Sequence, residues 1–320
     1  MTETASRDWE LEQPYDLVGT MRALADSASD PTWHVDEAGD ATLAVRAMWT
    51  ADGPTTVEFR SRRRPRGATT ELTATAYGPG ANWVAGRADW MAGLHDDPAI
   101  PAADVHPVVR SAARGQSGVL MARSLSLWDV VVPTVLGQRV TKAEAHRSWR
   151  GLVAGHGSQA PGPHDVRLAP SPRTVLDLGD AHWHTLGVER RRADAVRGII
   201  RRLDTLERVA GPPQAPDVSR TSEFRRVAET IPGVGEWTST ALAAAVLGDP
   251  DVVLLGDLHL PNGICFALAG EHRGSDERML ELLEPFRPQR GRVTRLLKTS
   301  GMASAPRRGP RYNPLPIAEM

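Results

Sequence analysis

The sequence predicts an α+β protein in which a small antiparallel sheet precedes an all-helical region, and three observations support this fold class. First, residues 1–105 contain short alternating runs and five of the nine tryptophans, as in a packed sheet domain. Second, from about residue 106 the apolar residues recur at helical spacing. Third, 320 residues with 41% hydrophobic and 24% charged side chains suffice for several compact units and exclude a disordered chain.

The first region is expected to be a domain of its own, with a helix packed on a three-stranded sheet. Alternation of apolar and polar side chains marks each strand, and the Asp52-Gly53-Pro54 sequence between the first two strands is typical of a hairpin turn. The expected elements are a helix at 14–25, strands at 41–49, 55–59 and 70–77, and a turn-like segment at 60–68.

The second region, residues 106–304, is expected to be helical and divided into two halves. A capping-box-like pattern at residues 126–129 predicts a helix to about residue 153, which Pro133 either kinks or begins. Gly248 is a suitable C-cap for the alanine-rich helix before it. Further helices are predicted at 196–203, 224–231, 239–247, 276–283 and 291–299, followed by a loosely held Arg/Pro-rich tail at 305–320.

Composition limits the chemistry. The chain has 38 basic and 39 acidic residues, and its only lysines are Lys142 and Lys298, so the other 36 basic residues (38 − 2) are arginines. Any reaction that needs an amine nucleophile must use one of these two lysines. The single Cys265 excludes a disulfide framework, a CxxC zinc site and a four-cysteine cluster. We expect a cytoplasmic protein with no membrane partner, because the N-terminus is polar and no apolar run approaches ~18 residues.

The sharpest motif is residues 230–238, TIPGVGEWT, in which two glycines flank one apolar residue between two helices. Gly233 and Gly235 permit backbone conformations that are closed to other residues, and Val234 can turn inward. The amides of Gly235, Glu236 and Trp237 would then point outward from a helix N-terminus and suit one phosphate. This is the sequence of a helix-hairpin-helix, which holds DNA by its backbone; the alternative is a tight helical turn without a ligand.

With the residues that follow, the chain resembles the helix-hairpin-helix DNA glycosylases of the 3-methyladenine DNA glycosylase II type. The family pattern is a Pro-Gly-x-Gly-x-Trp-Thr hairpin, a loop, and an essential aspartate, whose position Asp257 occupies. Residues 135–140, VLGQRV, resemble the family's Leu-Gly-Gln-x-Val helix, and residues 186–193 resemble its Leu-Gly turn. The resemblance covers about residues 118–300 and implies that the preceding sheet domain is similar to the TATA-binding protein.

The resemblance implies roles for four side chains. Asp257 would stabilise the positive charge that develops on the sugar when the glycosidic bond breaks, although an N-cap is a compatible structural role. Trp237 would line the base pocket, or else pack in a core. Arg139, assisted by Gln138, would fill the gap left by the extruded base, or else Arg139 is an ordinary exposed arginine. We expect no organic cofactor and no catalytic metal.

The hairpin would bind the DNA phosphate through Gly233, Val234, Gly235, Glu236 and Thr238. Family resemblance also suggests a monovalent cation on the backbone carbonyls of the hairpin, which here belong to Glu229, Ile231 and Val234.

The expected function is therefore a monofunctional DNA glycosylase that hydrolyses the N-glycosidic bond of alkylated purines in duplex DNA and acts as a monomer. Bifunctional relatives carry a lysine two residues after the last hairpin glycine, and this chain has Trp237 there. Ala241, Leu258 and Lys298 stand where aromatic residues are found in some members, which leaves the preferred lesion open. The alternatives are a non-catalytic damaged-DNA-binding protein and a glycosylase for oxidised or deaminated bases.

Three weaker signals have structural alternatives. Two basic clusters would contact phosphates or form solvated faces. His182 and His184 are a weak metal signal, and His259 would either tune the site or lie on the surface. The clusters are Arg60, Arg62, Arg63, Arg64 and Arg66, and Arg190–Arg192 with Arg197, Arg201 and Arg202.

Overall fold

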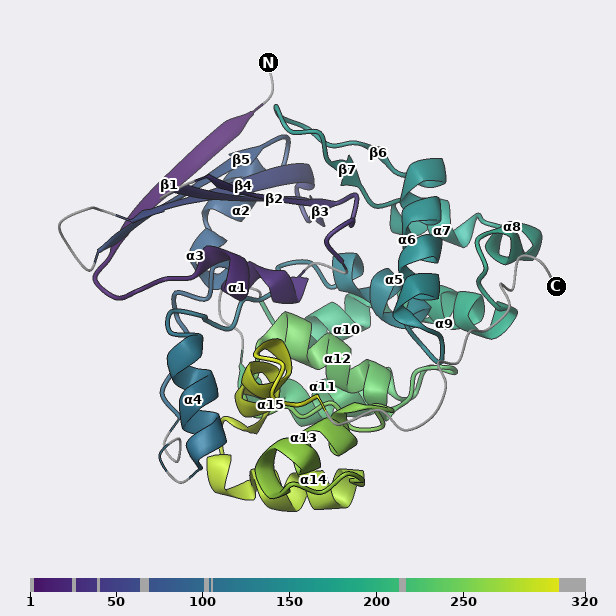
Figure 1. Cartoon of the computed structure of the whole chain (residues 1–320). Helices are drawn as coiled ribbons and strands as arrows, with labels where there is room; N and C mark the ends of the chain where they lie inside the picture. Colours follow the sequence, from purple (N-terminus) through teal and green to yellow (C-terminus); the bar gives the residue numbers. More distant parts are fainter. Residues whose placement is uncertain are drawn as a thin grey trace.

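The computed structural model describes residues 3–24, 27–38, 41–63, 69–100, 104, 106–212 and 217–304. A five-stranded antiparallel sheet with strand order β1-β5-β4-β3-β2 forms the N-terminal region, and helices make up most of the remainder (Figure 1). The α+β class is therefore confirmed. The strands are β1 (Thr4–Leu11), β2 (Trp33–Ala38), β3 (Ala41–Thr50), β4 (Gly53–Arg63) and β5 (Thr70–Tyr77).

The three predicted strands correspond to β3, β4 and β5, whereas β1 and β2 were not predicted. Both missed strands are edge strands whose side chains are largely exposed, so their sequences lack a clear apolar alternation. The segment predicted as turn-like at 60–68 was wrong in its first part, because β4 continues to Arg63. Residues 64–68, with Arg64 and Arg66, lie outside the described residues.

One face of the sheet carries the first hydrophobic core. Met48, Phe59 and Leu72 point into it and are at most 1% exposed. The predicted helix at 14–25 is shorter than expected, because α1 (Leu17–Met21) passes directly into a 3₁₀ turn (Arg22–Leu24). Figure 1 shows α1, α2 (Ala81–Ala85) and α3 (Ala88–Met91) on the same side of this sheet.

The helical region contains two further cores, one around α5, α9 and α12 and another around α4, α13, α14 and α15. A two-stranded ladder, β6 (Ser158–Gln159) with β7 (Arg167–Leu168), lies between α6 and α7. The helices are α4 (Pro107–Gly115), α5 (Trp128–Leu136), α6 (Lys142–His156), α7 (Pro172–Leu176), α8 (Asp180–Thr185), α9 (Arg190–Ile200), α10 (Leu203–Ala210), α11 (Thr221–Ala228), α12 (Glu236–Leu247), α13 (Leu260–Ala269), α14 (Asp276–Leu283) and α15 (Arg290–Thr299).

The single helix predicted from residue 126 to 153 is in fact two helices, α5 and α6, separated at residues 137–141. Pro133 lies inside α5 and does not end it. The break comes instead at Gly137, and a true capping box restarts the chain, in which Thr141 and Glu144 bond each other's backbone amides. The break places Gln138 and Arg139 in a turn and no longer on a helix face.

Buried polar contacts join the sheet to the helices. The backbone amide of Trp49 on β3 donates to Asp129 on α5 at 3.0 Å, and the indole of Trp149 on α6 donates to Asp30 at 2.9 Å. Arg46 is also buried here. Burial, which Arg46 and two hydrogen bonds only partly oppose, raises the pKa of Asp129 to about 6. None of the described helices has both the length and the apolar character to cross a bilayer.

Candidate active site and nucleic-acid interface

The hairpin between α11 and α12 has the predicted form. Gly233 has φ +87°, and a Cβ at this position would lie 2.8 Å from the Cβ of Ala195 on α9, so both conformation and space require glycine here. Val234 is only 5% exposed and packs between the helices. Its amide donates to the carbonyl of Ile231 at 3.0 Å, which closes the turn.

Gly235 is different from Gly233, and the expectation that it needs a special backbone conformation was wrong. Its φ of −101° and ψ of −177° are ordinary extended values, and a Cβ would point into open space. Gly235 is the N-cap of α12, and no side chain among the described residues caps this helix. The first amides of α12 therefore carry the unsatisfied donors and partial positive charge of a helix N-terminus.

Charged side chains surround this helix end. Glu236, the first residue of α12, would repel a phosphate, but Arg225 on α11 donates to its carboxylate at 3.0 Å. Glu229 accepts from the hydroxyl of Ser239 at 2.6 Å, which ties the start of the hairpin to α12.

Gln138 connects the turn after α5 to the hairpin. Its side-chain amide donates to the carbonyl of Gly233 at 3.0 Å and to the hydroxyl of Thr238 at 2.8 Å. Both hydrogens of the amide are therefore used within the protein, and Gln138 fixes the hairpin relative to α5. A role in filling the duplex remains a prediction for this residue.

Arg139 is exposed and has φ +56°, and among the described residues it is the one non-glycine residue with a positive φ. A side chain in this conformation costs roughly 1–2 kcal/mol, so the surrounding turn must impose it. Beneath the turn, the buried guanidinium of Arg192 donates to the carbonyl of Leu136, the last residue of α5, at 2.9 Å. This hydrogen bond anchors the start of the turn, and the side chain of Arg139 is exposed to solvent.

Trp237 and Asp257 meet at the start of α12. The indole Nε1 of Trp237 donates to Oδ2 of Asp257 at 3.3 Å. A Cβ on Gly137 would lie 3.6 Å from the Trp237 ring, and one on Gly256 would lie 3.7 Å from the Trp237 Cβ. The half-buried Trp237 thus stands between the turn that carries Arg139 and the loop that carries Asp257.

The other oxygen of Asp257, Oδ1, binds two backbone amides at the start of α13, whose N-cap residue is His259 and not Asp257 as the sequence allowed. Oδ1 accepts the backbone amides of His259 at 2.9 Å and Leu260 at 2.8 Å. Burial by itself would raise the pKa of Asp257, but these two amide hydrogen bonds, the positive charge of Lys298 and the Trp237 indole together hold the pKa below its usual value. Asp257 is therefore a half-buried carboxylate that is ionised at neutral pH, and its two oxygens have different partners.

Lys298 lies near this carboxylate, and Lys142 lies near Lys298. Desolvation and the like charge of Lys142 lower the pKa of Lys298, and the charge of Asp257 opposes this effect. Lys298 is accessible to solvent at the C-terminal end of α15, although the protein around it partly desolvates its ammonium. The sequence placed Lys142 and Lys298 at opposite ends of the helical region, and spacing alone gave no sign that they would meet.

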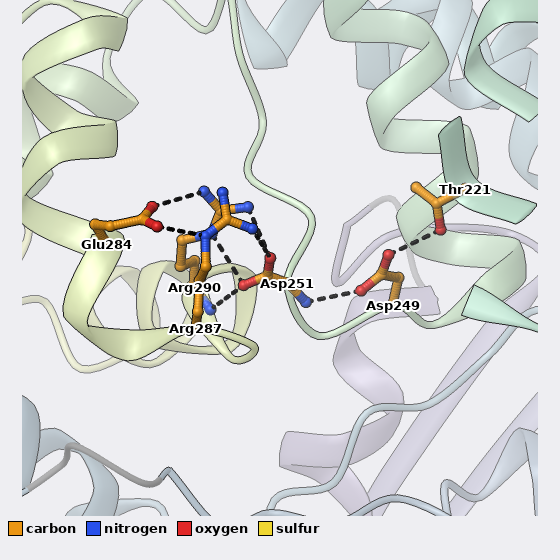
Figure 2. Close-up of polar contacts among 6 residues, drawn as sticks. All are labelled: Thr221, Asp249, Asp251, Glu284, Arg287 and Arg290. Atoms are coloured by element: carbon orange, nitrogen blue, oxygen red, sulfur yellow. Dashed lines mark hydrogen bonds and ion pairs between the residues drawn. The ribbon is translucent and has the colours of Figure 1, made fainter. Parts of the chain in front are cut away.

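The loop between α12 and Asp257 is fixed at two points (Figure 2). Asp249 accepts from the hydroxyl of Thr221 on α11 at 2.8 Å. Asp251 accepts from the guanidinium of Arg290 at 2.7 and 2.9 Å and from that of Arg287 at 3.3 Å, and Glu284 pairs with both arginines. These contacts, which we call the brace, join α11, the loop and α15. Sequence reasoning missed the brace because its bonded pairs lie up to 39 residues apart.

A third contact holds the loop directly before Asp257. The amide of Gly256 donates to Asp276 on α14 at 2.9 Å, and Gly256 has φ +73°. In the sequence, acidic residues at the start of α14 are typical of a helix N-terminus, but they do not predict the bond between Asp276 and Gly256.

Several arginines of the two basic clusters have partners within the protein. Arg60 pairs with Glu58, and Arg190 and Arg197 pair with Asp180 and Asp194. Arg192 is buried at 4% exposure, so the expectation that it could contact phosphate was wrong. Arg191, Arg201 and Arg202 are exposed.

The histidine signals have similar outcomes. His182 contacts His156 with a nitrogen–nitrogen distance of 2.5 Å, while Trp183 between His182 and His184 is buried. No group of three potential metal ligands occurs within the described part of the chain. His259 is exposed and is the N-cap residue of α13, and its backbone amide donates to Asp257.

Solved structures share this architecture. A 3-methyladenine DNA glycosylase from Archaeoglobus fulgidus is 16% identical, with a TM-score of 0.70, over 92% of this chain and 99% of that one. An 8-oxoguanine glycosylase/lyase from Clostridium acetobutylicum is 9% identical, with a TM-score of 0.57, over 83% of this chain and 99% of that one. No protein-family model and no curated protein matches the chain. The chain thus has the fold of the helix-hairpin-helix DNA glycosylases.

Proposed function

We propose that this protein is a monofunctional DNA glycosylase that removes alkylated purines of the 3-methyladenine type from duplex DNA and leaves an abasic site. The observation that carries the proposal is the contact between Asp257, an ionised and half-buried carboxylate, and Trp237 at the start of a helix whose N-terminus is uncapped. The fold shared with the Archaeoglobus fulgidus 3-methyladenine DNA glycosylase supports it.

The proposed chemistry needs one carboxylate. The C1′–N bond breaks, its electron pair leaves with the base, and C1′ becomes cationic; Asp257 stabilises this charge and accepts a proton from the water that attacks C1′. An alkylated purine is already cationic and leaves as a neutral base, so little acid catalysis is required. Trp237 offers an aromatic face to such a base.

The hairpin would hold one DNA phosphate through the amides at the start of α12 and thereby position the duplex. The proposed cation would bind the carbonyls of Glu229, Ile231 and Val234; the Ile231 carbonyl already accepts one hydrogen bond and keeps a second lone pair. We further propose that the sheet region (residues 1–105) is the TATA-binding-protein-like domain of these enzymes and precedes two helical halves within residues 106–304.

Unlike the Clostridium acetobutylicum glycosylase/lyase, this protein would have no lyase activity. Trp237 occupies the position that would need a lysine, and we assign Lys298 an electrostatic role because it faces the carboxylate of Asp257. Incubation of the product with borohydride tests this assignment, since an imine between an amine and the abasic sugar would be trapped as a covalent protein–DNA adduct.

A second candidate function is the removal of a neutral oxidised or deaminated base. The positive charge of Lys298 beside Asp257 favours it, because an ammonium repels a cationic purine and can donate to the acceptor of a neutral one. A third alternative, a damage-binding protein without catalysis, would retain the fold and lack base release.

One assay separates these candidates. Duplexes with 3-methyladenine, 7-methylguanine, hypoxanthine, ethenoadenine or 8-oxoguanine are incubated with the protein and then treated with alkali. Strand breaks that appear only after alkali support a monofunctional glycosylase, and the substrate that reacts identifies the lesion. Asp257→Asn should abolish base release while leaving DNA affinity within about twofold; wild-type rates in this variant would show that the carboxylate is not catalytic.

A further inference from the structure

Leu258 is the most exposed large apolar side chain among the described residues. It is 80% exposed, compared with 44% for Val218 and 36% for Leu176. Single exposed apolar residues are common on protein surfaces, so exposure alone assigns no role. The position of Leu258 does, because it directly follows the carboxylate of Asp257.

The segment that carries Leu258 is held rigidly on both sides. Before it, the amide of Gly256 is bonded to Asp276 at 2.9 Å. After it, the amides of His259 and Leu260 are bonded to Asp257 at 2.9 and 2.8 Å. These contacts fix the backbone of a short turn, so the side chain of Leu258 is presented to solvent by a preorganised loop and loses little entropy on binding a partner.

The turn that carries Arg139 and the loop that carries Leu258 both approach Trp237. Gly137, two residues before Arg139, lies against one part of the Trp237 side chain, and Gly256, two residues before Leu258, lies against its Cβ. The bond from the Trp237 indole to Asp257 completes this arrangement. The turn thus carries a cationic residue with a positive φ, and the loop carries an exposed apolar side chain.

We propose that Leu258 is an apolar DNA-contacting residue that inserts beside the extruded nucleotide from the loop that follows Asp257. Apolar side chains inserted between base steps unstack them and stabilise a bent duplex, which an arginine at position 139 does less well. The inference rests on the proposed function, because it needs a nucleotide that leaves the stack toward Trp237.

The experiment compares Leu258→Ala with wild type in binding to a duplex that carries a tetrahydrofuran abasic-site analogue and to the same duplex without it. Leu258→Ala should lose about tenfold in affinity for the analogue duplex, the order expected when a leucine no longer becomes buried, and less than twofold for the undamaged duplex. Leu258→Met should retain wild-type affinity. The melting temperature should not change, because the side chain makes little contact with the core.

Leu176→Ala, the same substitution at an exposed leucine on α7, is the matched control and should leave both affinities unchanged. Equal analogue binding by Leu258→Ala and wild type would overturn the proposal, and so would an equal loss on both duplexes, which would indicate a general backbone contact. If wild type itself does not prefer the analogue duplex and releases no base, the proposed function fails as well, so the two failures are distinguishable.

Discussion

At the scale of single residues, the two oxygens of Asp257 have separate partners. Its Oδ1 satisfies two amides at the start of α13, and its Oδ2 faces Trp237. These contacts keep the carboxylate ionised despite partial burial. The pKa of Asp257 therefore depends on neighbouring groups, and single substitutions can test the effect of each group.

Lys298→Met should move the acidic limb of the pH–rate profile to higher pH. Burial opposes ionisation of Asp257, and Lys298 is one of the groups that outweigh it and lower its pKa. Removing the ammonium raises this pKa, so the ionised form, and with it base release, is lost at a higher pH as the solution is acidified. Single-turnover rates between pH 4 and 8 measure the shift.

Lys142→Met is the control, because Lys142 acts on Lys298 and is not among the causes of the Asp257 shift. Identical acidic limbs in Lys298→Met and wild type would contradict the electrostatic role.

At the scale of elements, the hairpin contains two glycines with different requirements. Gly233 is fixed by its φ and by contact with α9, whereas Gly235 has ordinary backbone angles and open space before it. The same substitution at the two positions therefore separates folding from DNA binding.

Gly233→Ala should destabilise the protein by at least the roughly 1–2 kcal/mol of a left-handed residue, because its Cβ also clashes with Ala195. Gly235→Ala should lower the unfolding free energy by at most about 1 kcal/mol, because alanine is a poorer N-cap than glycine, and should weaken binding to any duplex about tenfold, since its methyl group would stand before the amides of α12. Thermal unfolding and fluorescence anisotropy measure the two effects. Unchanged DNA affinity in Gly235→Ala would indicate that this helix end does not meet the backbone.

Asp251→Ala should slow base release more than it weakens DNA binding, because the loop that carries Asp257 loses its contact with Arg290 and Arg287 (Figure 2). Loss of this partly buried pair should also lower stability by on the order of 1–3 kcal/mol. Glu284→Ala removes a more exposed partner of the same arginines and should have a small effect on both quantities. Equal effects of the two variants on the single-turnover rate would mean that the brace does not position Asp257.

At the scale of the whole molecule, the sheet and the helices are joined by ionisable groups that are almost fully buried. Asp129 lies at this junction with a pKa raised to about 6, mainly by burial. The folded-state pKa of Asp129 lies above its unfolded value. Its contribution to the free energy of unfolding is therefore complete below about pH 4, where the carboxyl is protonated in both states, and is lost as the pH rises through about 6.

Asp129→Asn should therefore become more stable relative to wild type between pH 4 and pH 7, by on the order of 2–3 kcal/mol. Asparagine keeps an oxygen that can accept the amide of Trp49, so the hydrogen bond survives. Urea unfolding at several pH values measures the difference. A stability difference that is constant with pH would show that Asp129 does not titrate in this range.

The sequence predicted those elements of the fold that depend on interactions between residues close together in the chain. Local patterns identified β5 and α14 with their bounds, and the hairpin with its inward Val234. The edge strands β1 and β2 were missed because their sequences lack alternation of apolar and polar residues. The break before α6 was missed because apolar residues recur at helical spacing on both sides of it, whereas the break itself is made by a capping box.

The candidate site divided in the same way. Trp237 and Asp257 were predicted from a motif, and the structure brings them into contact. Gln138 as a hairpin clamp, the contact between Asp276 and Gly256, and the approach of Lys142 to Lys298 depend on tertiary packing, which no local spacing encodes.

The small number of lysines, one of them close to Asp257, also means that amine chemistry can label this protein at few positions. In a chain whose other side-chain cations are all arginines, a reagent that acylates amines has Lys142, Lys298 and the terminal amine as its targets. A fluorophore attached to Lys298 would lie close to Asp257, and its emission could follow the binding and release of DNA without an engineered attachment site.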